Sequence, residues 1–179
     1  MDEVLEAFLR GRSPVWSGLA HWQTGEVAVS TYLCSECPPV TFITSARAVV
    51  LRADSVLVVR DPERWHAVPG GRIEPGESME DTARREVLEE TGWDVDLAGV
   101  IAFRHLQWLV PLSGPQPNPY PDFLQVIFAA RARRHRPEAR ESEGYETGAE
   151  FRLIEGLSGL TEEDNHLIEA ARKLAGNVS

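Results

Sequence analysis

The sequence contains few cysteines, fewer basic than acidic residues, and no long apolar run. It has 18 lysine and arginine residues against 28 aspartate and glutamate residues, which gives a formal net charge of -10. Nucleic-acid backbones are held by clusters of positive side chains, so this balance argues against a nucleic-acid polymer as partner. No apolar stretch reaches membrane-spanning length, and the Met-Asp-Glu start lacks the features of a secretory signal. We therefore expect a cytoplasmic protein with no membrane partner.

The only two cysteines, Cys34 and Cys37, have the spacing of half a zinc site. A structural zinc ion takes four ligands, but there is no second cysteine pair and His21 is the only upstream histidine. The missing ligands favour two ordinary reduced thiols. A zinc site that is degenerate or shared within an assembly is one alternative, and a redox role is a weaker one.

Length and composition indicate one compact core, since 179 residues with 42% hydrophobic content suffice for a single domain. Residues 1–40 are predicted to be an N-terminal extension, with an amphipathic helix over 2–10 and a strand over 26–33. Pro14, Gly18 and Gly25 punctuate the segment between them. Such an extension can complete the sheet, cover the active site or form a homodimer. The main domain is expected to span residues 41–179.

Within residues 41–179, the pattern predicts strands flanked by helices, an α/β arrangement. Apolar and β-branched segments at 44–51 and 55–60 predict a hairpin, and further strands are expected at 65–68, 95–105, 123–132 and 149–154. Residues 111–121 are too rich in proline for a helix or strand and are expected to form a wall or lid of the site. A capping box at 161–164 opens a last helix whose buried stripe is predicted to be Leu167, Ile168, Ala171, Leu174 and Ala175.

The segment from Gly71 to Trp93 carries the chemistry. Ser78, followed three residues later by Asp81, predicts a helix N-cap, and Gly92 predicts the C-terminal stop. The helix then begins near Met79, and Ala83, Val87 and Leu88 supply its apolar side. Glycines at 70 and 71 form a loop directly before this segment.

Three carboxylates, Glu86, Glu89 and Glu90, lie at positions i, i+3 and i+4 of this helix and share one face. Neighbouring like charges are costly unless they are neutralised, and carboxylate oxygens without cysteine or histidine suit Mg²⁺ or Mn²⁺. The alternative is a solvated acidic face, but that interpretation leaves the glycine loop unexplained. The pattern therefore indicates metal-assisted attack on a phosphate.

This segment resembles the Nudix box, G-x5-E-x7-R-E-U-x-E-E-x-G-U, in which U is a bulky apolar residue. Every fixed letter is present, and Val87 and Trp93 occupy the two apolar positions; the matching residues are Gly71, Glu77, Arg85, Glu86, Glu89, Glu90 and Gly92. The resemblance implies an α/β/α sandwich with a mixed β-sheet. It also implies metal-dependent hydrolysis of a nucleoside diphosphate linked to another moiety.

By this resemblance, Glu86, Glu89, Glu90 and the carbonyl of Gly70 are the expected metal ligands. Glu89 could instead act as the base. Arg85 and Glu77 are expected to form a salt bridge that orients the loop and the helix around Gly71. In this family a later loop often supplies a further acid, as an extra metal ligand or as the general base. Among Glu143, Glu146 and Glu150 we favour Glu146 for this role. A Nudix fold that binds nucleotides without catalysis is the alternative.

Several residues outside the Nudix box are candidates for contacts with the substrate. Strand-end arginines could meet phosphates and aromatic residues could stack on a base; the candidates are Arg47, Arg60, Trp65, Arg104, Trp108 and Tyr120. The arginines between 131 and 140 could guide an anionic substrate, but a solvated turn is favoured. The run from Gln116 to Asp122 resembles a Gln-Pro-x-Pro-x-Pro element of NADH pyrophosphatases, and Cys34 and Cys37 resemble half of their zinc ribbon. Hydrolysis of NADH or another dinucleotide is therefore the alternative substrate hypothesis.

Overall fold

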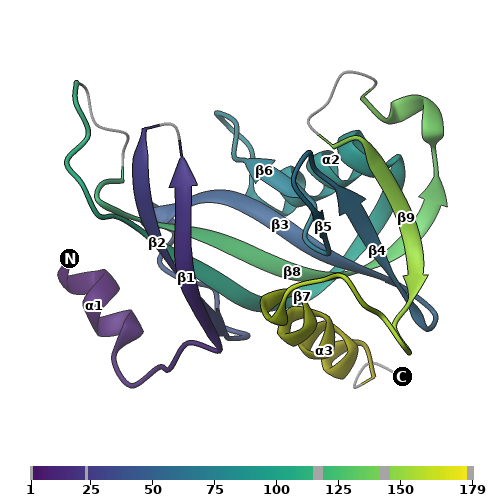
Figure 1. Cartoon of the computed structure of the whole chain (residues 1–179), viewed down its shortest axis with the longest axis horizontal. Coiled ribbons are helices and arrows are strands. Elements are labelled where there is room, and N and C mark those ends of the chain that lie inside the picture. Colours follow the sequence, from purple (N-terminus) through teal and green to yellow (C-terminus); the bar gives the residue numbers. More distant parts are fainter. Residues whose placement is uncertain (1, 23, 115–118, 142–145, 177–179) are drawn as a thin grey trace.

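The computed structural model describes residues 2–22, 24–114, 119–141 and 146–176. Within these ranges, three α-helices and nine strands form a mixed sheet with helices on both faces (Figure 1). In chain order the elements are α1 Glu3–Leu9, β1 Trp16–Trp22, β2 Gly25–Leu33, β3 Ile43–Arg52, β4 Ser55–Arg60, β5 Trp65–His66, β6 Gly70–Arg72, α2 Met79–Thr91, β7 Trp93–Trp108, β8 Asp122–His135, β9 Gly148–Leu153 and α3 Glu162–Gly176.

The sheet runs in the order β1-β2-β7-β8-β3-β4-β5, with β6 paired to β3 and β9 paired to β4. Strands β3 and β8 are parallel, and the other pairs are antiparallel. Helices α2 and α3 cover opposite faces of this sheet (Figure 1). The predicted α/β/α sandwich with a mixed sheet is confirmed.

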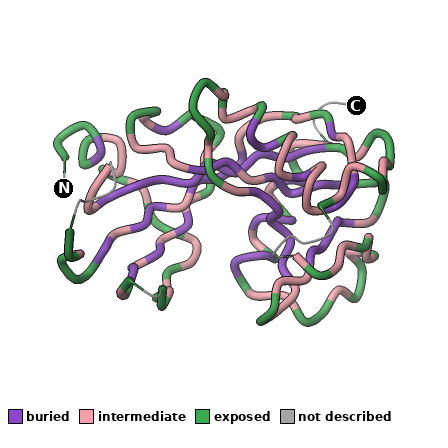
Figure 2. Tube along the Cα trace, turned by 90° about the horizontal axis from the view of Figure 1, so that it is seen from above, coloured by how far each residue is buried: buried purple, intermediate pink, exposed green. Residues whose placement is uncertain are grey.

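The core forms because the central strands alternate their side chains between the two helices. On β3, Val49 and Leu51 face α3, whereas Ala48 and Val50 face α2. Strand β8 is buried without interruption from 122 to 130 because both of its faces are covered. Figure 2 shows this concentration of buried residues on the strands that cross the middle of the molecule.

The N-terminal segment adds to the same sheet. Strand β2 pairs with β7, with Val27 opposite Trp108 and Leu33 opposite Ala102, and β1 forms the outer edge. Helix α1, capped by Asp2, buries Leu5 beside Phe103. None of the helices in the described ranges has the length and apolarity that a membrane crossing requires.

Strand β1 occupies the segment that the sequence marks with proline and glycine. Gly18 lies inside this strand, where the Trp16 ring covers its Cα. A Cβ at Gly18 would lie 2.5 Å from that ring, so the position requires glycine. Strands β7 and β8 are also longer than predicted, since three irregularities in their pairing let them curve together over 93–108 and 122–135. The other predicted strands and the last helix are present with shifts of a few residues at their ends.

Candidate functional site

Helix α2 is fixed at both ends and on its inner face. The Ser78 hydroxyl oxygen accepts a hydrogen bond from the Asp81 amide at 3.0 Å, and Gly92 ends the helix in the left-handed conformation. Ala83 and Val87 are fully buried against the sheet. This packing leaves the glutamates of the helix on the side that faces the glycine loop.

Two glycines let the loop approach this helix. A Cβ on Gly70 would overlap the Ala46 carbonyl oxygen and the backbone of Arg47, and Gly70 also has a φ of 145°. A Cβ on Gly71 would overlap the carboxylate of Glu86. Strand β6 can therefore pair with β3 because Gly70 lacks a side chain, whereas a side chain at Gly71 would displace the Glu86 carboxylate.

Arg85 holds the carboxylates and the loop together. Its guanidinium forms two bonds with Glu77, from Nε at 2.7 Å and from Nη2 at 2.9 Å, so the ion pair expected between them is present. Its Nη1 lies 3.0 Å from both Glu86 and Glu89, and Nη2 donates to the Arg72 carbonyl at 3.1 Å. Hydrogen bonds from Arg85, and then from Thr82, lower the pKa of Glu77 to about 2. Glu77 is therefore a fixed anion that anchors Arg85.

Glu90 and Glu86 differ from Glu77, because their pKa values are raised and not lowered. Glu90 accepts from the Gly70 amide at 3.1 and 3.3 Å, yet burial, and then the negative charge of Glu146, raise its pKa to about 9. Burial also raises the pKa of Glu86, against the opposing effect of Arg85. The protein alone does not compensate these charges fully, so the site favours a proton or a cation beside them.

The donor set fits a hard divalent cation by its chemistry, because it offers carboxylate and carbonyl oxygens without sulfur or imidazole. In the described ranges, however, no three acidic, histidine or cysteine residues are grouped as a metal site would require. Glu86 and Glu89 are engaged with Arg85, and Glu90 with the Gly70 amide. Binding of a cation would exchange some of these contacts for metal contacts.

Arg47 on β3 is the positive group on the opposite side of this site. Its Nη1 donates to the Val68 carbonyl at 3.1 Å, whereas its buried Nε has no hydrogen-bond partner within the described chain. Burial lowers the pKa of Arg47, and Arg104 acts in the same direction, whereas Glu90, Glu86 and Glu146 oppose them. The charges of Arg47 and Glu146 therefore act on the same site as those of Glu86 and Glu90.

Arg140 connects Glu146 to α2. Its Nε donates to the carbonyl of Glu90 at 3.0 Å and its Nη2 to the carbonyl of Glu146 at 3.1 Å. This half-buried contact differs from the solvated turn that the sequence favours for the 131–140 arginines. Glu150 pairs with Arg152 at 2.7 Å, and Glu143 lies outside the described residues.

A cavity of about 610 Å³ begins at this site, with Arg47, Gly71 and Arg72 in its lining. Trp22, Ile43, Trp108, Phe123 and Gln125 are among the other lining residues. Pro119 also lines it and belongs to the proline-rich segment, whereas Gln116, Pro117 and Asn118 lie outside the described residues.

Four candidate substrate contacts are engaged elsewhere. The Arg60 guanidinium lies 5.9 Å from the Trp65 ring centre, on which Arg152 also stacks at 4.1 Å. Arg104 donates to Glu163 of α3 at 2.6 Å, and Tyr120 packs on the apolar cluster around Trp108. Of the six candidates, Arg47 and Trp108 thus line the cavity beside the box.

Sequence interpretation missed Arg72, Trp22, Phe123 and Gln125 as cavity residues. Arg72 directly follows Gly71, and this adjacency to the box was an available signal. The other three carry no local signal, because only the pairing of distant strands brings them to one place.

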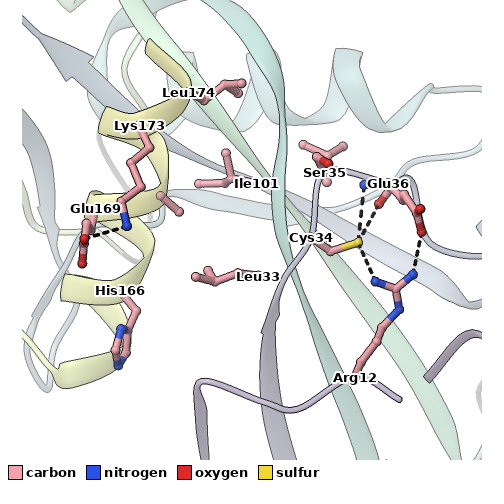
Figure 3. A pocket seen from close by; sticks show the side chains of 12 residues that line it. Arg12, Leu33, Cys34, Ser35, Glu36, Ile101, His166, Glu169, Lys173 and Leu174 are labelled. Carbon is pink, nitrogen blue, oxygen red and sulfur yellow. Dashed lines mark hydrogen bonds and ion pairs between the residues drawn. The ribbon is translucent and has the colours of Figure 1, made fainter. Parts of the chain in front are cut away.

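Cys34 lines a second cavity, of about 460 Å³, between α3 and the segment after β2 (Figure 3), whereas the Cys37 sulfur lies near the Pro38 carbonyl and the Met79 sulfur. Arg12 contacts both the Cys34 sulfur, at 3.2 Å, and the Glu36 carboxylate, at 2.5 Å. His166, Glu169 and Lys173 line this cavity from α3, where Lys173 is paired with Glu169 at 2.7 Å (Figure 3). Both cysteines are free thiols in this structure, and Cys37 is exposed.

Comparison with known proteins places this geometry in a family. A family model described as the NUDIX domain matches residues 41–171. A Bacillus subtilis protein, provisionally named as an 8-oxo-dGTP diphosphatase, is 44% identical over 55 residues, 30% of this chain and 36% of that protein. The NAD-capped RNA hydrolase NudC of Escherichia coli is 32% identical over 104 residues, 55% of this chain and 36% of that protein. The chain thus spans only 36% of the length of each of these relatives.

Among solved structures, the Bacillus subtilis pyrophosphohydrolase BsRppH is similar over almost the whole chain. The alignment covers 92% of this chain and 98% of that one, with a TM-score of 0.60 and 15% sequence identity. At this identity the likeness establishes the fold alone.

Proposed function

Because the chain belongs to the Nudix family, we propose that it is a divalent-metal-dependent hydrolase of a pyrophosphate bond in a nucleotide-type small molecule. The substrate would be a nucleoside diphosphate linked to another moiety. The observation that carries the proposal is the pair Glu86 and Glu90, which contact the glycine loop and whose pKa values are raised by burial. Gly71 of this loop lines a cavity together with Arg47. Carboxylates in this state favour a cation beside them.

Glu86, Glu89, Glu90 and the Gly70 carbonyl would hold Mg²⁺ or Mn²⁺. When bound, the metal supplies charge neutralisation at the phosphate oxygens and makes water a better nucleophile. The remaining work falls to the protein. Arg47 binds the diphosphate, and Glu77 holds Arg85 so that the loop and helix keep their spacing around Gly71.

Hydrolysis transfers a water oxygen to phosphorus and breaks the bond to the bridging oxygen. A carboxylate must accept the proton that the water loses. Glu146 is our choice for this base, because it lies close enough to Glu90 to raise the Glu90 pKa. Glu89 is the alternative base, and Arg85 keeps its carboxylate oriented at 3.0 Å.

A dinucleotide is the second candidate substrate. The similarity to the NAD-capped RNA hydrolase NudC favours it, together with the proline-rich run from Gln116 to Asp122. The cysteine pair resembles only half of a zinc ribbon. The net charge of -10 supports a small substrate over an RNA polymer, and we propose that the enzyme meets it in the cytoplasm.

The test is turnover of a substrate panel with Mg²⁺ or Mn²⁺, with products identified by mass spectrometry. The panel contains nucleoside triphosphates including 8-oxo-dGTP, ADP-ribose, NADH, dinucleoside polyphosphates and an NAD-capped oligonucleotide. We expect release of a nucleoside monophosphate or diphosphate from at least one compound. Glu90→Gln should reduce kcat by about 100-fold or more, because it weakens the metal site.

Glu80→Gln is the matched control, because Glu80 lies in the first turn of the same helix, before the box carboxylates. It should retain kcat. Saturable nucleotide binding without turnover under any metal condition, and unaffected by Glu90→Gln, would instead identify a non-catalytic binding module.

A further inference from the structure

The cavity beside the box has an aromatic end formed by Trp22, Trp108 and Phe123. The Trp22 ring centre lies 5.2 Å from that of Trp108, nearly edge-on, and 5.9 Å from that of Phe123. Trp108 and Phe123 are 9% and 8% exposed, whereas Trp22 is 39% exposed. Trp108 and Phe123 therefore belong to the core, whereas Trp22 lines the cavity and remains accessible.

Trp22 comes from outside the segment that matches the family domain. It is the last residue of β1, and the family model begins at residue 41. Its position is nevertheless fixed by the sheet, since Trp22 pairs with Gly25 and Val27 of β2 pairs with Trp108 of β7. The N-terminal hairpin thus supplies a wall of the cavity that residues 41–171 do not contain.

The other end of the cavity is charged. Arg47 and Arg72 lie in its lining with Gly71, whose missing side chain leaves room for the Glu86 carboxylate. Both arginines carry a positive charge, which suits an anionic group at this end. A ligand that matches both ends carries an anionic group and an aromatic ring.

We propose that Trp22 stacks on the nucleobase of the substrate and so makes the N-terminal hairpin a determinant of substrate specificity. This inference rests on the proposed function, because it assumes that the diphosphate binds at the box. It assigns the aromatic end to the base and the arginine end to the phosphates. The preferred substrates are then nucleotides, and compounds that carry a diphosphate without a base bind through the arginine end alone.

Stacking on an aromatic side chain depends on the ring face, so it tolerates different bases and is lost when the ring is removed. Truncation of one such platform corresponds to about a 5- to 100-fold loss of affinity. Trp22→Phe keeps a ring at the same position and should restore most of the binding.

The experiment measures binding by calorimetry in the presence of Mg²⁺, with ADP and inorganic pyrophosphate as the two probes. Trp22→Ala should weaken ADP binding about 5- to 100-fold and leave pyrophosphate binding within about twofold, and Trp22→Phe should fall within about threefold of the wild type for ADP. Leu19→Ala is the matched control, since Leu19 is an exposed apolar residue of the same strand and lies outside the cavity lining. Its binding of both probes should not change.

Unchanged ADP binding in Trp22→Ala, or an equal loss for both probes, would overturn the proposal, and so would a wild-type protein that binds pyrophosphate but not ADP. Circular dichroism and Tm verify that each variant is folded. Binding is measured apart from turnover, so a wild type without hydrolysis would refute the proposed reaction and leave the Trp22 result standing. If the reaction is found, Trp22→Ala should raise KM far more than it lowers kcat.

Discussion

The box and the cavity next to it are assembled in opposite ways. The box carboxylates, their arginine and their glycine loop come from one continuous stretch, so one cap and one helix period place them together. The cavity collects Trp22, Arg47, Trp108 and Gln125 from strands that are far apart in the chain. The catalytic groups are thus encoded in one local segment, whereas the selection of a substrate depends on the whole sheet.

The largest effect in this comparison should come from the arginine inside the box. Arg85→Ala removes both bonds to Glu77 and the contacts to Glu86 and Glu89. We expect kcat to fall by about 10- to 100-fold, because the catalytic groups lose their spacing. Steady-state kinetics on the substrate found in the panel measures this.

Arg84→Ala is the control variant, because it removes the neighbouring arginine of α2. Arg84 is exposed and contacts Asp81 at 3.4 Å, away from the carboxylates. Its kcat should stay within about twofold of the wild type, as expected for a surface ion pair. Similar losses in both variants would mean that Arg85 has no special role in the site.

An effect of similar size, but on KM in place of kcat, is expected on the cavity side. Arg47→Gln removes the positive charge opposite Glu86 and Glu90, and we expect KM to rise about 10- to 100-fold with a smaller change in kcat. Arg60→Gln is the comparison, since Arg60 also ends a strand but lies near Trp65 outside the cavity lining. Equal KM changes in both variants would remove the distinction between the cavity and the rest of the surface.

The smallest effect on activity should come from a buried acid outside both regions. The Thr161 hydroxyl caps α3 by accepting from the Asp164 amide at 3.1 Å. The Asp164 carboxylate accepts in return from the Thr161 hydroxyl at 2.7 Å, and from the Ala67 amide at 3.1 Å. Burial alone would raise the pKa of Asp164, but the hydrogen bonds from Thr161 and Ala67 and the charge of Arg64 together lower it. A lowered pKa in the folded state means that the charged form of Asp164 stabilises the fold.

This stabilisation is complete above the ordinary aspartate pKa of about 3.9 and is lost as pH falls from there through the lowered pKa of the folded state. Asp164→Asn should therefore cost about 1–3 kcal/mol at neutral pH, show a flatter loss of stability in acid, and retain kcat. Urea unfolding at several pH values measures it, with exposed Asp96→Asn as control. Parallel pH profiles for the wild type and Asp164→Asn would contradict the assignment.

The sequence predicts most of the box correctly because its signals are local. Ser78 and Gly92 mark the helix ends, and the structure has its helix at Met79–Thr91 as expected. The sequence does not predict strand β1, because a glycine at position 18 normally indicates the end of a strand. Only the structure shows that the Trp16 ring covers Gly18. Nor does the sequence separate Arg47 from Arg60, two strand arginines that differ only in which neighbours the tertiary fold gives them.

The most direct test of the account is Mn²⁺ binding followed by electron paramagnetic resonance in the wild type, the double variant Glu86→Gln with Glu90→Gln, and Glu80→Gln. We predict that the wild type and Glu80→Gln bind Mn²⁺ alike, and that the double variant binds at least about tenfold more weakly, since a hard cation depends on charged oxygen ligands. Equal Mn²⁺ affinity in all three proteins would contradict the assignment of the metal to the α2 carboxylates.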